Sequence, residues 1–221
     1  MDVVSTQNLH LIPPISELKQ LLKSLAVLDS ILCPEWEYRL YSYNAHWADG
    51  EEMASMRNGC GDEYYILFNS NGCFIKGFAH ETAMSSWGTT NQQPWQGIID
   101  TVPIEFESAV NEPAFSMDNI SFCIWRTLTD KEWKIGSFDF AGDDDPDGSE
   151  YLLELFDGDP ASYVNFATDY FEVELDLPTV ASIYEHKPLN LNMIYKLNPD
   201  ADLEQIKADL LEIGYASEIE K

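Results

Sequence analysis

The sequence predicts an α+β protein with an N-terminal helix, an antiparallel β-meander and C-terminal helices that include one late strand. Leucines at three- and four-residue spacings over 16–32 indicate a helix. Aromatic and branched residues broken by turns over 36–80 indicate strands, and helical patterns return after residue 159. The 221 residues are 45% hydrophobic, which is enough for a buried core. We expect a single domain, 1–221, with a possible subdomain break within 81–120.

Local signals indicate the first helix and the meander. Ser16 can cap the helix and Pro34 lies beyond its end. Turn sequences rich in Asn, Asp and Gly then separate the apolar runs, which we interpret as a four-stranded antiparallel meander. The run at 64–68 has no polar alternation, so we expect both of its faces to be buried. The strands are expected at 36–43, 53–57, 64–68 and 73–78.

Shorter elements follow the meander. Asp159 before Pro160 favours the start of a helix, and Gly214 is a natural end for the last one. Alternation of apolar and polar residues favours a late strand at 191–197. The elements expected after residue 80 are short helices at 94–99 and 103–110, a hairpin of 122–128 with 133–140, the late strand, and helices at 159–171, 178–185 and 200–213.

Acidity is the outstanding feature of the composition. The chain has 39 Asp and Glu against 12 Lys and Arg, a formal net charge of −27. Residues 1–110 carry a net charge of −9, and residues 111–221 carry −18. No Lys or Arg occurs between Lys134 and Lys187, an interval with 14 acidic residues. Such a field repels phosphates, so we expect no nucleic-acid partner, and it attracts cations and basic proteins.

The sequence favours a cytoplasmic location. The first residues lack the basic and apolar segments of an export signal. No apolar run approaches the roughly 18 residues that indicate a membrane span, so we expect no membrane association. The four cysteines are far apart and form no Cys-x-x-Cys pair, which indicates reduced thiols.

Residues 143–154 match the pattern of a calcium-binding loop. Carboxylates at positions 1, 3 and 5 aim oxygens inward, a glycine at position 6 permits a sharp turn, and a glutamate at position 12 closes the shell. Over these twelve residues the chain resembles an EF-hand loop, although Glu150 stands where that family has an aliphatic residue. A solvated acidic turn gives the same composition. The calcium ligands would be Asp143, Asp145, Asp147 and Glu154.

The polar residues of the meander are a second candidate site. A histidine beside carboxylates can act in acid–base catalysis, so the alternative function is a hydrolase-like or small-ligand-binding enzyme with its site within 51–81. The outer face of a half-buried sheet carries the same residue types. The sequence has no nucleophile-elbow, phosphate-loop or dinucleotide motif, which makes catalysis the less favoured interpretation. The candidate residues are Arg57, Asp62, Glu63 and His80.

The leading hypothesis is a non-catalytic interaction protein that binds a basic partner through its acidic C-terminal half. Carboxylates raise the encounter rate with a cationic surface, and aromatic anchors supply affinity. Acidic proteins that neutralise basic toxins offer an analogy based on charge alone. Phe156 is a further aromatic candidate, but core packing is its favoured role. The candidate binding residues are Asp143, Asp144, Asp145, Asp147, Glu150, Tyr151, Asp157 and Asp159.

Overall fold

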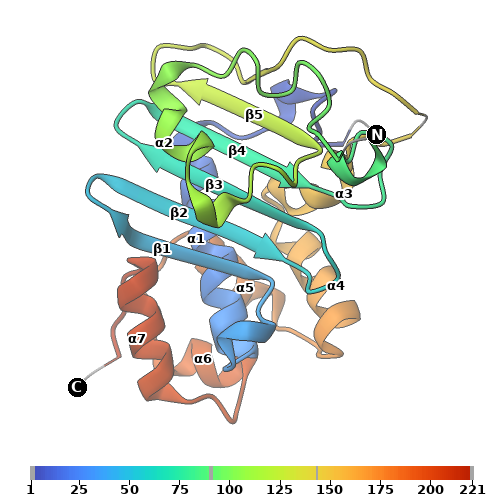
Figure 1. Ribbon diagram of the computed structural model, residues 1–221. Coiled ribbons are helices and arrows are strands. Elements are labelled where there is room, and N and C mark those ends of the chain that lie inside the picture. Colours follow the sequence, from blue (N-terminus) through green and yellow to red (C-terminus); the bar gives the residue numbers. More distant parts are fainter. Residues whose placement is uncertain (1–2, 90–91, 143, 220–221) are drawn as a thin grey trace.

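The computed structural model describes residues 3–89, 92–142 and 144–219 (Figure 1). Within these residues the fold is built on a six-stranded antiparallel sheet, in which each strand pairs with the next along the chain. The predicted α+β class is therefore confirmed. The strands are β1 (Tyr41–Ala48), β2 (Glu51–Arg57), β3 (Glu63–Asn69), β4 (Gly72–Phe78), β5 (Phe122–Thr127) and β6 (Lys134–Ile135). The α-helices are α1 (Ile15–Leu32), α2 (Glu107–Val110), α3 (Ser149–Leu152), α4 (Pro160–Phe171), α5 (Leu177–Tyr184), α6 (Leu191–Leu197) and α7 (Leu203–Ile213).

The sheet lies between two layers (Figure 1). On the face covered by α1 and the C-terminal helices, Tyr64 and Ile66 belong to the larger buried cluster. The segment 81–120, which includes α2, covers the other face, where Leu67 packs in a cluster with Phe74. The strand β3 is therefore buried on both faces, as its run without polar alternation predicts. The hairpin predicted at 122–128 with 133–140 continues the same sheet, because β5 pairs with β4, but its second strand is only the two residues of β6.

Capping residues set the ends of two C-terminal helices. Asp159 accepts a hydrogen bond from the backbone N–H of Ala161 (2.9 Å), and α4 begins at Pro160 as the sequence predicts. Gly214 adopts a φ of 68° and ends α7. No helix in the described ranges has both the length and the apolar character needed to cross a membrane.

The strand predicted at 191–197 is wrong, because these residues form the helix α6. The side chain of Asn190 accepts a hydrogen bond from the backbone N–H of Met193 (3.1 Å) and so caps the helix. Met193, Ile194 and Leu197 are buried on one helical face. Over seven residues, a set of apolar positions can satisfy both a period of two and a period of 3.6.

Three smaller predictions are also corrected. Residues 94–99 form turns in place of a short helix. The first strand begins at Tyr41, after a 3-10 turn over Trp36–Tyr38, where the sequence suggested a start at residue 36. Pro14, and not Ser16, is the N-cap of α1, because the helix begins one residue earlier than expected.

Candidate functional site

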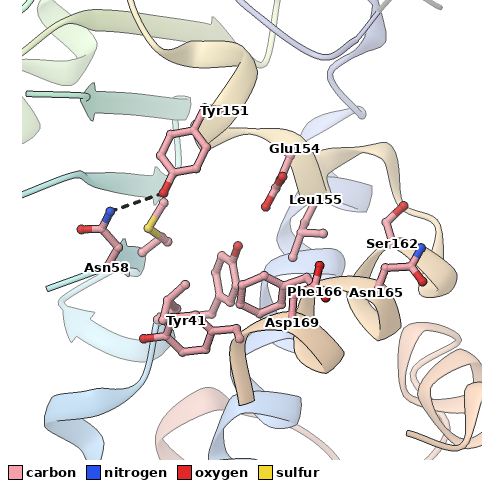
Figure 2. Close-up of a pocket in the computed structure, with 12 residues that line it drawn as sticks. Tyr41, Asn58, Tyr151, Glu154, Leu155, Ser162, Asn165, Phe166 and Asp169 are labelled. Atoms are coloured by element: carbon pink, nitrogen blue, oxygen red, sulfur yellow. Dashed lines mark hydrogen bonds between the residues drawn. The ribbon is translucent and has the colours of Figure 1, made fainter. Parts of the chain in front are cut away.

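A cleft of about 610 Å³ lies between the edge of the sheet and α4 (Figure 2). It is formed by the start of β1, the end of β2, the segment from α3 through the 3-10 helix η6 (Glu154–Asp157), and α4. No Lys, Arg or His in the described part of the chain lines it. A volume in this range is typical of ligand sites. The aromatic residues of the lining are Tyr41, Tyr151, Phe166 and Tyr170, and the polar ones are Asn58, Glu154, Ser162, Asn165 and Asp169.

The buried carboxylate of Asp29, in α1, holds two walls of the cleft together. Its Oδ2 atom accepts hydrogen bonds from the backbone N–H groups of Leu40 (3.0 Å) and Tyr41 (2.9 Å), where β1 begins. Its Oδ1 atom accepts a hydrogen bond from the hydroxyl of Tyr163 (2.8 Å) in α4. Burial raises the pKa of Asp29 to about 7, although these hydrogen bonds oppose the rise. The geometry of the cleft therefore depends on the carboxylate of Asp29, which lies in the core and does not line the cleft.

The aromatic wall of the cleft is a packed group of rings. Tyr41 contacts Phe166 edge to face, with ring centroids 5.7 Å apart. Phe166 stacks on Tyr170, one helical turn further along α4, at 5.4 Å. The rings thus support one another from two different elements.

Several polar side chains of the cleft have no protein partner. Tyr41 is only 4% exposed, yet its hydroxyl makes no hydrogen bond within the described part of the chain. The side chains of Glu154, Asn165 and Asp169 form neither ion pairs nor hydrogen bonds with the described residues. Burial raises the pKa of Glu154, and the negative charge of Asp157 adds to the rise. The carboxylate of Glu154 therefore lacks a compensating positive charge.

The structure divides the acidic residues that the sequence proposed for binding. Asp144, Asp157 and Asp159 are exposed, and Glu150 is half-buried. Tyr151 is 51% exposed and lines the cleft, whereas Phe156 is buried in the core. Asp143 lies outside the described residues.

Two of the proposed binding acids serve the fold. Asp147 is buried, so its carboxylate is not on the surface where a partner could reach it. It accepts hydrogen bonds from the hydroxyl of Thr6 (2.5 Å) and the backbone N–H of Ser149 (3.0 Å), which tie the N-terminal segment to α3. Burial raises its pKa, and these hydrogen bonds oppose the rise. Asp145 accepts hydrogen bonds from the next two backbone N–H groups of α3, those of Glu150 (2.9 Å) and Tyr151 (3.1 Å).

Gly148, at the glycine position of the calcium-loop pattern, is explained by packing. It adopts a φ of 75°, and a Cβ atom there would lie 2.1 Å from the Cβ of Ala79. Within the described ranges, no three His, Cys, Asp or Glu side chains are grouped to hold a metal ion. Asp145, Asp147 and Glu154 face different surroundings: the start of α3, the buried N-terminal segment and the cleft.

Calcium binding by 143–154 stays a prediction, and a melting experiment tests it. If the loop binds calcium, millimolar calcium added after chelation will raise the melting temperature, because a ligand that binds only the native state stabilises it. A concentration 100 times the Kd corresponds to about 2.7 kcal/mol. The substitution Asp143→Ala should abolish the rise. An unchanged melting temperature in the intact protein would dispose of the site.

The meander candidates lie at one end of the sheet, where Arg57 is paired with Glu63 across β2 and β3, but their side chains have different partners. Asp62 and His80 lie together, with Oδ1 of Asp62 2.7 Å from Nδ1 of His80. Glu63 instead pairs with the buried Lys76 (2.7 Å), and Arg57 stacks over Trp36 at 4.3 Å. The lining of the cleft includes none of the four candidates, Arg57, Asp62, Glu63 and His80.

Asn58 links the Asp62–His80 pair to the cleft. Its amide donates a hydrogen bond to Asp62 (2.7 Å) and lies 3.4 Å from the hydroxyl of Tyr151 (Figure 2). Burial alone would raise the pKa of Asp62, but the hydrogen bonds from His80 and Asn58 lower it. The two regions that the sequence singled out separately therefore meet at this side chain.

Comparisons with other proteins assign no function to this chain. The chain matches no protein-family model, no curated protein and no solved structure. The sequence interpretation missed Tyr41, Phe166, Asp169 and Tyr170. The last three lie at 166, 169 and 170, spacings that place them on one face of α4, and this stripe of rings and a carboxylate was the available signal.

Proposed function

We propose that the protein binds a basic partner protein through the acidic surface around the cleft, which comprises the exposed acids of residues 144–174. One observation carries the proposal. None of these acids forms an ion pair with Lys, Arg or His among the described residues, and no Lys or Arg occurs in the sequence between Lys134 and Lys187. Unpaired surface carboxylates keep their attraction for an incoming cation.

The arrangement of the surface supports binding over catalysis. Glu154, Asp157 and Asp159 follow one another along the segment that leads into α4, and Asp169 lies further along that helix. Tyr151 and Tyr170 are exposed beside them and offer large apolar contacts. An acidic surface with aromatic residues at its centre suits a positively charged protein.

Charge-neutralising variants test the proposal. Binding of a fluorescein-labelled peptide of eight lysines should weaken about tenfold between 50 and 300 mM salt, because salt screens exposed charges. The double variant Asp157→Asn, Asp159→Asn should weaken binding at least threefold at low salt. Asn retains a capping oxygen at both positions, so α4 should remain folded. Fluorescence polarisation measures the Kd.

A matched control separates a site from net charge. The pair Glu105→Gln, Asp118→Asn removes the same charge from the segment that covers the opposite face of the sheet, where both residues are exposed. We expect it to leave the Kd within twofold of the unmodified protein. Equal weakening by the two pairs would mean that the peptide responds only to total charge, which contradicts the proposal.

A further inference from the structure

The cleft is lined by a tyrosine whose hydroxyl has no hydrogen-bond partner among the described residues. Tyr41 lines the cleft and is 4% exposed, and its hydroxyl makes no hydrogen bond to the described residues. A hydroxyl that lines a cleft and has no protein partner is free to hydrogen-bond a ligand. A hydroxyl oxygen accepts a hydrogen bond readily from an ammonium or guanidinium group.

The charges in the cleft favour a positively charged ligand group. Glu154 and Asp169 both line it, and neither has a basic neighbour within the described chain. Figure 2 shows Glu154 reaching toward the cleft from the segment after α3, with Asp169 on the α4 side. A cation placed here would gain from both carboxylates, and an anion would be repelled.

The rings specify the shape of the partner. Tyr41, Phe166 and Tyr170 form a continuous aromatic wall. The methylene groups of a lysine or arginine side chain pack well on such a wall, and the positive head is attracted to the ring faces. A volume of about 610 Å³ accommodates one long side chain together with its flanking backbone.

We infer that the cleft receives one lysine or arginine side chain of the partner protein. The cationic head lies between Glu154 and Asp169, and the hydroxyl of Tyr41 accepts one of its hydrogen bonds. The inference rests on the proposed function, because it names the group by which a basic partner is recognised. The surrounding acids steer the partner, and the cleft selects the side chain.

Short peptides with one variable residue test the inference. The probes are acetyl-Gly-Gly-X-Gly-Gly-amide peptides in which X is lysine, arginine, N-acetyllysine or norleucine, titrated into the full chain and followed by NMR. The lysine or arginine peptide should bind saturably and shift the signals of Leu40, Tyr41 and Asn165. The norleucine and acetyllysine peptides should bind at least tenfold more weakly, because they lack the charge.

Substitutions in the cleft complete the test. Glu154→Gln with Asp169→Asn should weaken the lysine peptide at least tenfold, and Tyr41→Phe, which keeps the ring, two- to fivefold. The control pair Glu105→Gln, Asp118→Asn should have no effect. Thermal melting verifies that each variant is folded. Equal binding of the norleucine and lysine peptides, or unchanged binding in the cleft variants, would overturn the inference.

Three further outcomes have distinct meanings. If n-butylammonium binds as tightly as the lysine peptide, the cleft is a site for a free amine, and the assignment to a partner side chain is overturned. If the octalysine peptide still depends on Asp157 and Asp159 while the pentapeptides do not bind, the inference fails and the proposed function stands. If the octalysine peptide shows no such dependence, the proposed function itself fails.

Discussion

Replacing Asp29 with alanine is expected to destabilise the protein by about 3–5 kcal/mol, because three buried donors lose their acceptor and each unsatisfied donor costs about 1–3 kcal/mol. The donors are the backbone N–H groups of Leu40 and Tyr41 and the hydroxyl of Tyr163. Asp29→Asn should be far milder. The amide oxygen can accept from the two N–H groups, while the amide nitrogen donates to Tyr163. Urea denaturation of both variants measures the difference.

The same residue should make the stability depend on pH in an unusual direction. Burial raises the pKa of Asp29 to about 7, from 3.8 for an ordinary aspartate. Between about pH 4 and 7 the native state therefore retains a proton that the unfolded state has already released. The free energy of unfolding should therefore fall as pH rises through this window, by up to about 1.4 kcal/mol per pH unit, and become level above pH 7.

Asp29→Asn isolates this contribution. Burial also raises the pKa values of Asp147 and Glu154. In the intact protein, these groups and Asp29 all make the free energy of unfolding fall as pH rises. The difference in unfolding free energy between the intact protein and Asp29→Asn, measured by urea titration from pH 5 to 8, removes the contributions that both share. We expect that difference to move in favour of the variant as pH rises. Identical pH profiles would show that Asp29 is ionised at its ordinary pKa in the native state.

Local signals account for most of the fold. The turn Asn69–Gly72 joins β3 to β4 as its composition predicts, and Asp159 with Pro160 starts α4. Such signals act within a few residues, so they can be recognised in the sequence alone. The helix over 191–197 escaped because its apolar spacing fits two periods, and only the cap at Asn190 distinguishes them.

The cleft could not be predicted in the same way. Tyr41, Glu154 and Asp169 come from β1, η6 and α4, and only tertiary packing brings them together. Tyr151 is a candidate from the sequence because it lies among acids, but that neighbourhood does not predict its place in the cleft. Asp147 shows the converse, because the sequence proposes it as an exposed binding residue and the structure buries it. Its surroundings in the sequence are those of a solvated turn, but the hydroxyl of Thr6, 141 positions away, makes it a buried acceptor.

Removing either member of the Arg39–Asp209 pair is expected to destabilise the protein by about 3–5 kcal/mol, because it leaves the other charge buried and unpaired. Nη2 of Arg39 lies 2.7 Å from Oδ2 of Asp209, and the two side chains are 4% and 8% exposed. Arg39 also donates hydrogen bonds to the backbone carbonyls of Cys33 (2.7 Å) and Pro34 (2.9 Å). The pair thus fastens α7 to the connection between α1 and β1.

A double-mutant cycle separates the pair from its surroundings. Arg39→Met and Asp209→Leu should each cost several kcal/mol, but the double variant should cost less than their sum, because it removes both charges together. The pair Lys207–Glu204 on the same helix, with side chains 30% and 86% exposed, is the matched control, and its cycle should give a coupling below about 1 kcal/mol. Additive costs at Arg39 and Asp209 would mean that the two side chains stabilise the protein independently, and would contradict the role of the ion pair in fastening α7.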